Sequence, residues 1–186
     1  MIQIFETVTE TKLLGTIITD SLTWDLNTAE IVKKANARMQ LLRKVASFGT
    51  SQMELKEVYI LFIRSLLEQS AVVWHSSLTE ENRNDLERIQ KTACKIILGD
   101  KFKDYEQALL RLDLDNLHDR RTSLCLNFAR KSCKNPKTSD MFPRNYKKHN
   151  METRSPEEFE VQHANTERLL NSSIIYMQNL MNDNPC

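Results

Sequence analysis

Glycine is scarce in this chain of 186 residues: it occurs three times, where an average usage of about 7% would give roughly a dozen. Proteins that bind dinucleotides or phosphates through glycine-rich loops need glycine at special backbone positions, and so do collagen-like chains and most turn-dense β-barrels. The composition therefore excludes these classes and favours helices. The length suits one domain or two small ones.

Long apolar runs are missing too, since none reaches the roughly eighteen residues typical of a transmembrane helix. The first six residues lack the basic region and apolar core of a secretory signal. We therefore expect an intracellular chain, cytoplasmic or nuclear, that is not secreted and has no membrane partner. No Cys-x-x-Cys pair occurs, and reduced, mostly buried thiols are expected at Cys94, Cys125, Cys133 and Cys186.

Residues that carry chemistry are sparse. No Asp-Asp pair occurs, although two-metal polymerases and nucleases need clustered carboxylates. Asp113 and Asp115 form the nearest acidic pair, but they stand at an expected helix junction, where Asp commonly serves as a cap. No histidine stands at a zinc-ligand spacing with a cysteine, and no nucleophile elbow is present. We expect no metal, no cofactor and no small-molecule ligand, and no enzymatic activity of this chain by itself.

Strand signals are confined to the first twenty residues. Residues 2–5 and 12–18 are β-branched and apolar, with polar residues between them that could turn. Because a lone hairpin is marginal in water, it must pack on helices or belong to a sheet that is missing from the chain.

Capping signals divide most of the remaining chain into helices. Asn27 with Glu30, and Ser51 with Glu54, match the capping box. Thr79 is the expected cap of a third helix. Apolar residues follow at helical spacing after the first and third caps, and residues 51–67 are apolar on nearly every side, which predicts a buried helix.

The C-terminal half predicts further helices. Asp104 begins a short helix, and a fifth helix follows Leu117 and ends before Pro136. The fold class is therefore mainly α: a helical bundle preceded by a short N-terminal β-hairpin. We divide the chain into a hairpin at 1–24, three helices at 25–100, a helical extension at 101–135, an exposed connection at 136–160 and an amphipathic helix within 161–186.

The net charge of +1 hides two basic segments. Residues 31–48 hold five basic residues and no acidic one, and residues 120–148 hold nine basic residues against one Asp. A helix that needs only solubility usually mixes charges of both signs, so such a segment favours an anionic ligand, with the phosphate backbone as the obvious one. Plain solvation of an exposed face is the alternative.

The candidates for phosphate contacts fall into two groups. The first group is Lys33, Lys34, Arg38, Arg43 and Lys44, and the second is Arg120, Arg121, Arg130 and Lys131. Arg120 and Arg121 flank an apolar stripe, so they could instead hold helices together through acidic partners. Trp24 and Trp74 could stack on bases, but each adjoins an apolar run, which favours packing in the core.

A series of short motifs in order carries a resemblance to a known family. The motifs are Leu14-Gly15, Leu22-Thr23-Trp24, Lys34-Ala35-Asn36, Tyr59, Ile63-Arg64-Ser65, Val73-Trp74, Leu86, Ile89-Gln90, Gly99, Leu117 with Arg120-Arg121, Thr166-Glu167-Arg168, Ser173 and Asn182. Over about residues 12–182 this order resembles the C-terminal part of reverse transcriptases of non-LTR, LINE-type, jockey-like retrotransposons. The family usually differs at Leu13, Asn27 and Gln69, which fits a diverged copy.

The resemblance implies a role in an RNA-directed DNA polymerase. The hairpin would be the last one of the palm, and the helices after it would form the thumb, which grips the backbone of an RNA–DNA or DNA duplex. The fingers and palm, with the catalytic Asp-Asp motif and its Mg, would precede this chain and be its partners, so the chain should not polymerise by itself.

Two other interpretations stay open. In one, the chain is a helical protein-interaction module, or a domesticated or decayed remnant, that binds proteins and not nucleic acid. In the other, it is an independent enzyme that uses Asp113 and Asp115 with a metal.

Overall fold

The computed structural model describes residues 8–145 and 159–185. The chain is mainly helical with a two-stranded antiparallel hairpin near its N-terminus, which confirms the predicted fold class. The described residues form two compact units, one made of 8–70 and 78–118 and the other of 71–77, 119–145 and 159–185. Among the described residues, no helix combines the length and the apolar character that crossing a membrane requires.

The hairpin of the first unit pairs β1 (Glu10–Leu13) with β2 (Thr16–Thr19). Leu14 and Gly15 form the two-residue turn, with φ of 49° and 89°, as mirror-image hairpin turns require. The prediction of one strand over residues 12–18 is therefore wrong, because the apolar run folds back on itself at this turn. The strand expected at residues 2–5 lies outside the described residues.

Helix α1 (Asp25–Ser47) begins three residues before the predicted start, since its cap position is Trp24 and not Asn27. Asn27 is buried, and its Oδ1 accepts a hydrogen bond from the backbone N–H of Ile17 at 3.0 Å. The predicted capping box of Asn27 and Glu30 is thus wrong: the Asn side chain joins strand β2 to the helix, and no side chain caps α1.

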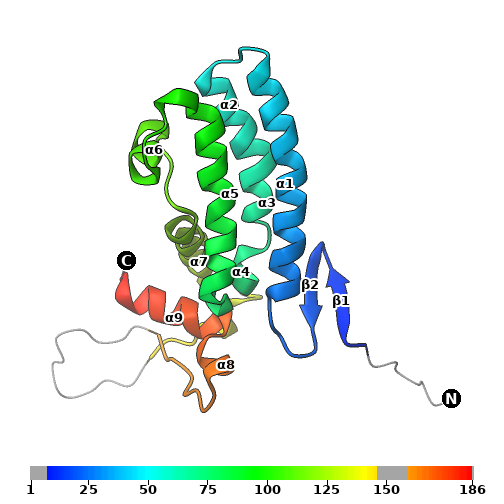
Figure 1. Cartoon of the computed structure of the whole chain (residues 1–186). Helices are drawn as coiled ribbons and strands as arrows, with labels where there is room; N and C mark the ends of the chain where they lie inside the picture. Colours follow the sequence, from blue (N-terminus) through cyan, green and yellow to red (C-terminus); the bar gives the residue numbers. More distant parts are fainter. Residues whose placement is uncertain (1–7, 146–158, 186) are drawn as a thin grey trace. The chain divides into compact units, whose positions relative to one another are not determined.

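Three helical rods build the core of the first unit (Figure 1). They are α1, the run of α2 (Gln52–Val58), η1 (Tyr59–Arg64) and α3 (Ser65–Leu67), and α5 (Glu80–Leu98). Each rod buries a stripe of mostly apolar side chains; the stripes comprise Ile31, Ala35, Met39 and Leu42, then Leu55, Tyr59, Ile63 and Leu67, then Leu86, Ile89, Ala93 and Ile97. The predicted caps at Ser51 with Glu54 and at Thr79 are confirmed by their hydrogen bonds.

The second rod departs from the prediction of a helix buried all round. Its central turn, η1, is π-helical, and Leu61 and Phe62 on it are 66% and 50% exposed. The rod packs against α1 and α5, and two neighbours cover only part of a helix surface. The remaining face therefore stays open despite its apolar sequence.

The first unit closes with two short elements after α5. The 3-10 turn η3 (Gly99–Lys101) leads to α6 (Tyr105–Leu112), which packs on α5. Asp104 caps α6, as predicted, by accepting from the backbone N–H of Gln107 at 2.8 Å. Asp113 ends the helix in the left-handed conformation.

The second unit contains α4 (Ala71–Trp74), η2 (His75–Ser77), most of α7 (Leu117–Cys133), η4 (Ser139–Met141), α8 (Glu167–Leu170) and α9 (Ser173–Asp183). The single amphipathic helix expected within 161–186 is in fact two helices, which separate at Asn171 and Ser172. Buried apolar side chains from four parts of this unit meet in one core: Cys125, Ala129, Phe142, Phe159, Met177 and Met181.

Phe142 and Phe159 belong to the segment expected to be an exposed connection. Both are buried, and a β-bridge pairs Arg144 with Phe159. The ends of that segment therefore pack into the second unit, while residues 146–158, with Lys147 and Lys148, lie outside the described residues.

Candidate nucleic-acid interface

The exposed side of α1 carries the first group of candidate residues. Ile31, Ala35 and Met39 are buried along one side of the helix, and Lys33 and Lys44 point away from them at helical spacing. Lys33, Arg43 and Lys44 are all exposed. Among the described residues, no acidic side chain lies within ion-pair distance of Arg43 or Lys44.

Two other cations of α1 are held by neighbouring groups. The Lys34 ammonium lies 3.0 Å from Glu30 Oε1, one turn earlier. The hydrogen bond and the charge of Lys34 lower the pKa of the Glu30 carboxyl. The Arg38 guanidinium donates to the backbone carbonyl of Phe62, so this side chain links α1 to η1. Both residues border the exposed side, but part of their charge already has a partner.

The second group lies on α7 and is less uniform. Lys131 is exposed and Arg120 is half-buried. Arg130 is half-buried, and its Nη2 donates to the backbone carbonyl of Asn184 at 3.0 Å. We therefore place these three below the α1 cations as candidates for phosphate contact.

Arg121 is fully buried in the second unit. Its Nε donates to His75 Nδ1 at 3.3 Å, and its guanidinium carbon lies 5.7 Å from the centre of the Trp74 ring. No phosphate backbone reaches a side chain in this position. The placement matches the alternative role of holding helices together, and His75 and the Trp74 ring are among its contacts.

Both tryptophans lie in the core and not on an exposed face. Trp24 is 8% exposed and Trp74 is fully buried, which confirms packing over base stacking. Among the described cysteines, Cys94 and Cys125 are buried free thiols and Cys133 is a half-buried one. Burial raises the pKa of the Cys94 and Cys125 thiols to about 11.

Asp113 and Asp115 are both exposed. Asp113 forms the C-terminal cap of α6, and Lys56 Nζ lies 3.8 Å from its Oδ2 and donates to its backbone carbonyl at 3.3 Å. Asp113 therefore stands at a helix junction, as expected, but it caps the end of α6 through its left-handed backbone and its N–H and not through its side chain. Within the described part of the chain, no group of three or more His, Cys, Asp or Glu residues has an arrangement that could hold a metal ion.

Two polar groupings in the first unit were not predicted from the sequence. One is a buried hydrogen-bond network around Gln90. The other is a hollow beside α6 whose charged lining residues are all cations. Their only sequence signals are a Gln on the buried side of a helix and a short run of mixed charges, neither of which reveals partners that are distant along the chain.

Comparison of the chain with protein families, with curated proteins and with solved structures gives no match. The case for a function therefore depends on the residues and their geometry.

Proposed function

We propose that the first unit binds the phosphate backbone of a nucleic-acid duplex through α1, as the non-catalytic, thumb-like part of a non-LTR retrotransposon reverse transcriptase. One observation carries the proposal: Lys33, Arg43 and Lys44 are exposed on a helix that has no acidic residue between positions 31 and 48. The order of short motifs described above supports the family.

The spacing of the cations suits a polyanion of regular structure. Lys33 and Lys44 lie on the same side of α1, and eleven residues of α-helix span about 16 Å. A single small anion does not reach both. A nucleic-acid strand presents a phosphate about every 3.4 Å along the helix axis, so a duplex lying along α1 offers a phosphate to each lysine.

Contacts of this kind predict how binding depends on salt and sequence. Lysine and arginine on phosphates release counterions, so the affinity falls steeply as salt rises, with a slope of about −0.9 in log K against log salt per neutralised phosphate of B-form DNA. Because no base edge is read, the affinity should depend little on sequence.

The test is a salt titration of binding to a fluorescent RNA–DNA duplex, followed by anisotropy. The double variant Lys33→Glu/Lys44→Glu should bind more weakly and show a shallower salt slope, by about one unit or more. Circular dichroism of each variant shows whether α1 stays folded, since Lys44→Glu also places a negative charge near the C-terminal end of a helix dipole.

A matched control has the same change in net charge at other exposed lysines. Lys91 and Lys95 both lie on α5 and are exposed. Lys91→Glu/Lys95→Glu should keep the slope of the unmodified chain. Absence of binding at low salt, or equal weakening by the two double variants, would reject the α1 interface.

A protein-binding module is the second candidate, and one observation favours it. Leu61 and Phe62 form an exposed apolar pair on η1, of the kind that protein interfaces cover. In that case Leu61→Ser/Phe62→Ser removes binding to the partner protein, while Lys33→Glu/Lys44→Glu leaves that binding unchanged. The thumb-like role predicts instead that Lys33→Glu/Lys44→Glu weakens duplex binding and that Leu61→Ser/Phe62→Ser does not.

A further inference from the structure

A hollow of about 420 Å³ lies beside α6 in the first unit. Its polar lining consists of Lys101, Lys103, Gln107 and Arg111, and Leu98 and Leu110 are among its apolar lining residues. We call this site the basic pocket. Its volume falls within the range of small-molecule sites, but it is a shallow surface hollow: Lys101, Lys103, Gln107 and Arg111 are exposed, and Leu110 is 83% exposed.

The charges around the basic pocket are segregated. Residues 100–111 contain as many acidic as basic residues, but all the basic ones line the hollow and none of the acidic ones does. Asp104, for example, uses its side chain to cap α6. The pocket is therefore positively charged although its segment is neutral.

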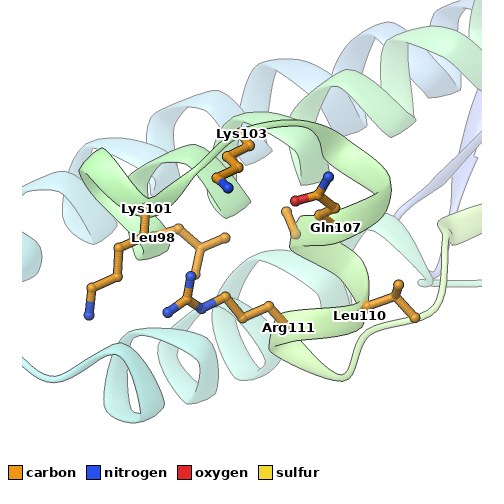
Figure 2. Close-up of a pocket in the computed structure, with 7 residues that line it drawn as sticks. Leu98, Lys101, Lys103, Gln107, Leu110 and Arg111 are labelled. Carbon is orange, nitrogen blue, oxygen red and sulfur yellow. The ribbon is translucent and has the colours of Figure 1, made fainter.

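The arrangement of the side chains is convergent (Figure 2). Lys103, Gln107 and Arg111 extend around the hollow with Leu98 between them, and Lys101 lies at its outer side. Lys101 and Lys103 flank Phe102, whose ring centre lies 5.5 Å from the Lys95 ammonium. This contact anchors the loop that carries the two lysines to α5.

We propose that the basic pocket binds a small phosphate-bearing ligand. Arg111 supplies a planar, two-pronged donor for phosphate oxygens, and Lys103 supplies a second charge. The Gln107 amide donates a further hydrogen bond, and the buried Leu98 contacts the apolar part of the ligand. A small-molecule ligand of this class is not expected from the sequence alone.

The position of the pocket separates it from the proposed duplex interface. Helix α5 packs against both α1 and α6, and it lies between these two helices in Figure 1. A concave site of limited volume also suits a small anion, whereas the convex side of a helix such as α1 suits a long polyanion. The pocket proposal is thus independent of the function proposed for α1.

Titration of the isotope-labelled full chain with inorganic pyrophosphate, followed by NMR, tests the pocket. Saturable shifts are expected at the backbone amides of Lys101, Lys103, Gln107 and Arg111. Lys103→Gln and Arg111→Gln should each weaken binding about tenfold, the effect of losing one charge-assisted hydrogen bond. Arg111→Lys should recover only part of the affinity, because a single ammonium lacks the paired donors of a guanidinium.

The control is Lys91→Gln, which removes an exposed lysine of α5 outside the pocket lining. It should bind pyrophosphate like the unmodified chain. Shifts that do not saturate, or equal losses in Lys91→Gln and Lys103→Gln, would show general attraction to surface lysines and overturn the proposal. Lys33→Glu/Lys44→Glu should keep pyrophosphate binding, so failure of the duplex proposal and failure of the pocket proposal give different results.

Discussion

The hydroxyl of Tyr59 donates a hydrogen bond to Oε1 of Gln90 at 2.6 Å, and both side chains are fully buried. The Gln90 amide nitrogen donates to the Tyr105 hydroxyl and to the backbone carbonyl of Asp115, both at 2.9 Å. Tyr105 in turn donates to Glu87. This network connects the second rod, α5 and α6, so the core of the first unit depends on polar contacts as well as apolar packing.

Removing Tyr59 from the network should destabilise the chain by about 1–2 kcal/mol, because Tyr59→Phe leaves a buried acceptor of Gln90 without its donor. Gln90→Leu should cost more, about 2–4 kcal/mol, since it deprives both the Tyr59 hydroxyl and the Asp115 carbonyl of a partner. Urea unfolding measures the free energy of unfolding of both variants. Gln40→Leu is the control, since Gln40 is exposed on α1, and its effect should be small. Equal, small effects of all three changes would contradict the network.

Replacing Leu14 by Asn should stabilise the chain. Leu14 is 87% exposed and has a φ of 49°, a left-handed conformation that costs a branched side chain about 1 kcal/mol or more. Asn is common at this position of mirror-image hairpin turns. We expect Leu14→Asn to raise the free energy of unfolding by about 0.5–1 kcal/mol, measured by urea unfolding. Leu14→Val, which is β-branched, should lower it.

Gly15 and Gly49 should respond differently to alanine. Both have positive φ, 89° and 78°, so each substitution strains the backbone. A Cβ at Gly15 would also lie 2.7 Å from Nε2 of Gln69, which donates to the Leu14 carbonyl at 3.2 Å, whereas a Cβ at Gly49 meets nothing within 4 Å. The end of the Gln69 side chain can move aside, with loss of this exposed hydrogen bond, so Gly15→Ala should be more destabilising by about 0.5 kcal/mol.

The Gln69 side chain provides the check on this explanation. In a Gln69→Ala background the obstruction is gone, so Gly15→Ala and Gly49→Ala should cost nearly the same. A difference that persists in that background would mean that the two turns differ in backbone strain and that Gln69 is not the cause.

Local patterns predicted those parts of the fold that depend on neighbouring residues. The capping box joins Ser51 to Glu54, three positions later, and the side-chain and backbone groups that satisfy it are all local. Asn27 shows the same local pattern, but it is buried and accepts from the Ile17 N–H of a strand. A backbone group of the neighbouring strand thus replaced the local helix N–H as the partner of Asn27. The residues around Asn27 in the sequence do not predict that contact.

The candidate interface shows the same limit. Exposure of Lys33 and Lys44 follows from helical period alone, since both stand opposite the apolar stripe of α1. Burial of Arg121 does not, because His75 and Trp74 stand more than forty positions away along the chain. Similarly, the hollow beside α6 depends on where the loop carrying Lys101 and Lys103 lies relative to Arg111, which charge counts along the sequence do not reveal.

Alkaline pH should destabilise the chain partly through Cys94. Burial, with a smaller effect of the Glu87 carboxylate, raises the pKa of this thiol from 9.0 to about 11. Below the lower value, the folded and unfolded chains both hold the proton, and the thiol adds no pH dependence. Between the two values, the unfolded chain loses the proton while the folded chain keeps it, so the free energy of unfolding falls as pH rises. From about pH 8 to about pH 10.5 the loss due to this thiol should be about 1–2 kcal/mol.

Comparison with Cys94→Ala isolates this contribution from other groups that titrate in the same range, such as Tyr59, whose pKa burial raises well above 10.0. Urea unfolding at both pH values should show that the free energy of unfolding falls less between about pH 8 and about pH 10.5 for Cys94→Ala than for the unmodified chain. The substitution itself lowers stability equally at both pH values, so this comparison does not depend on it. Ile96→Val, a change on the same helix that keeps the thiol, should lose as much as the unmodified chain. If Cys94→Ala loses as much as Ile96→Val, the thiol is ionised equally in the folded and unfolded states and the predicted effect of burial is wrong.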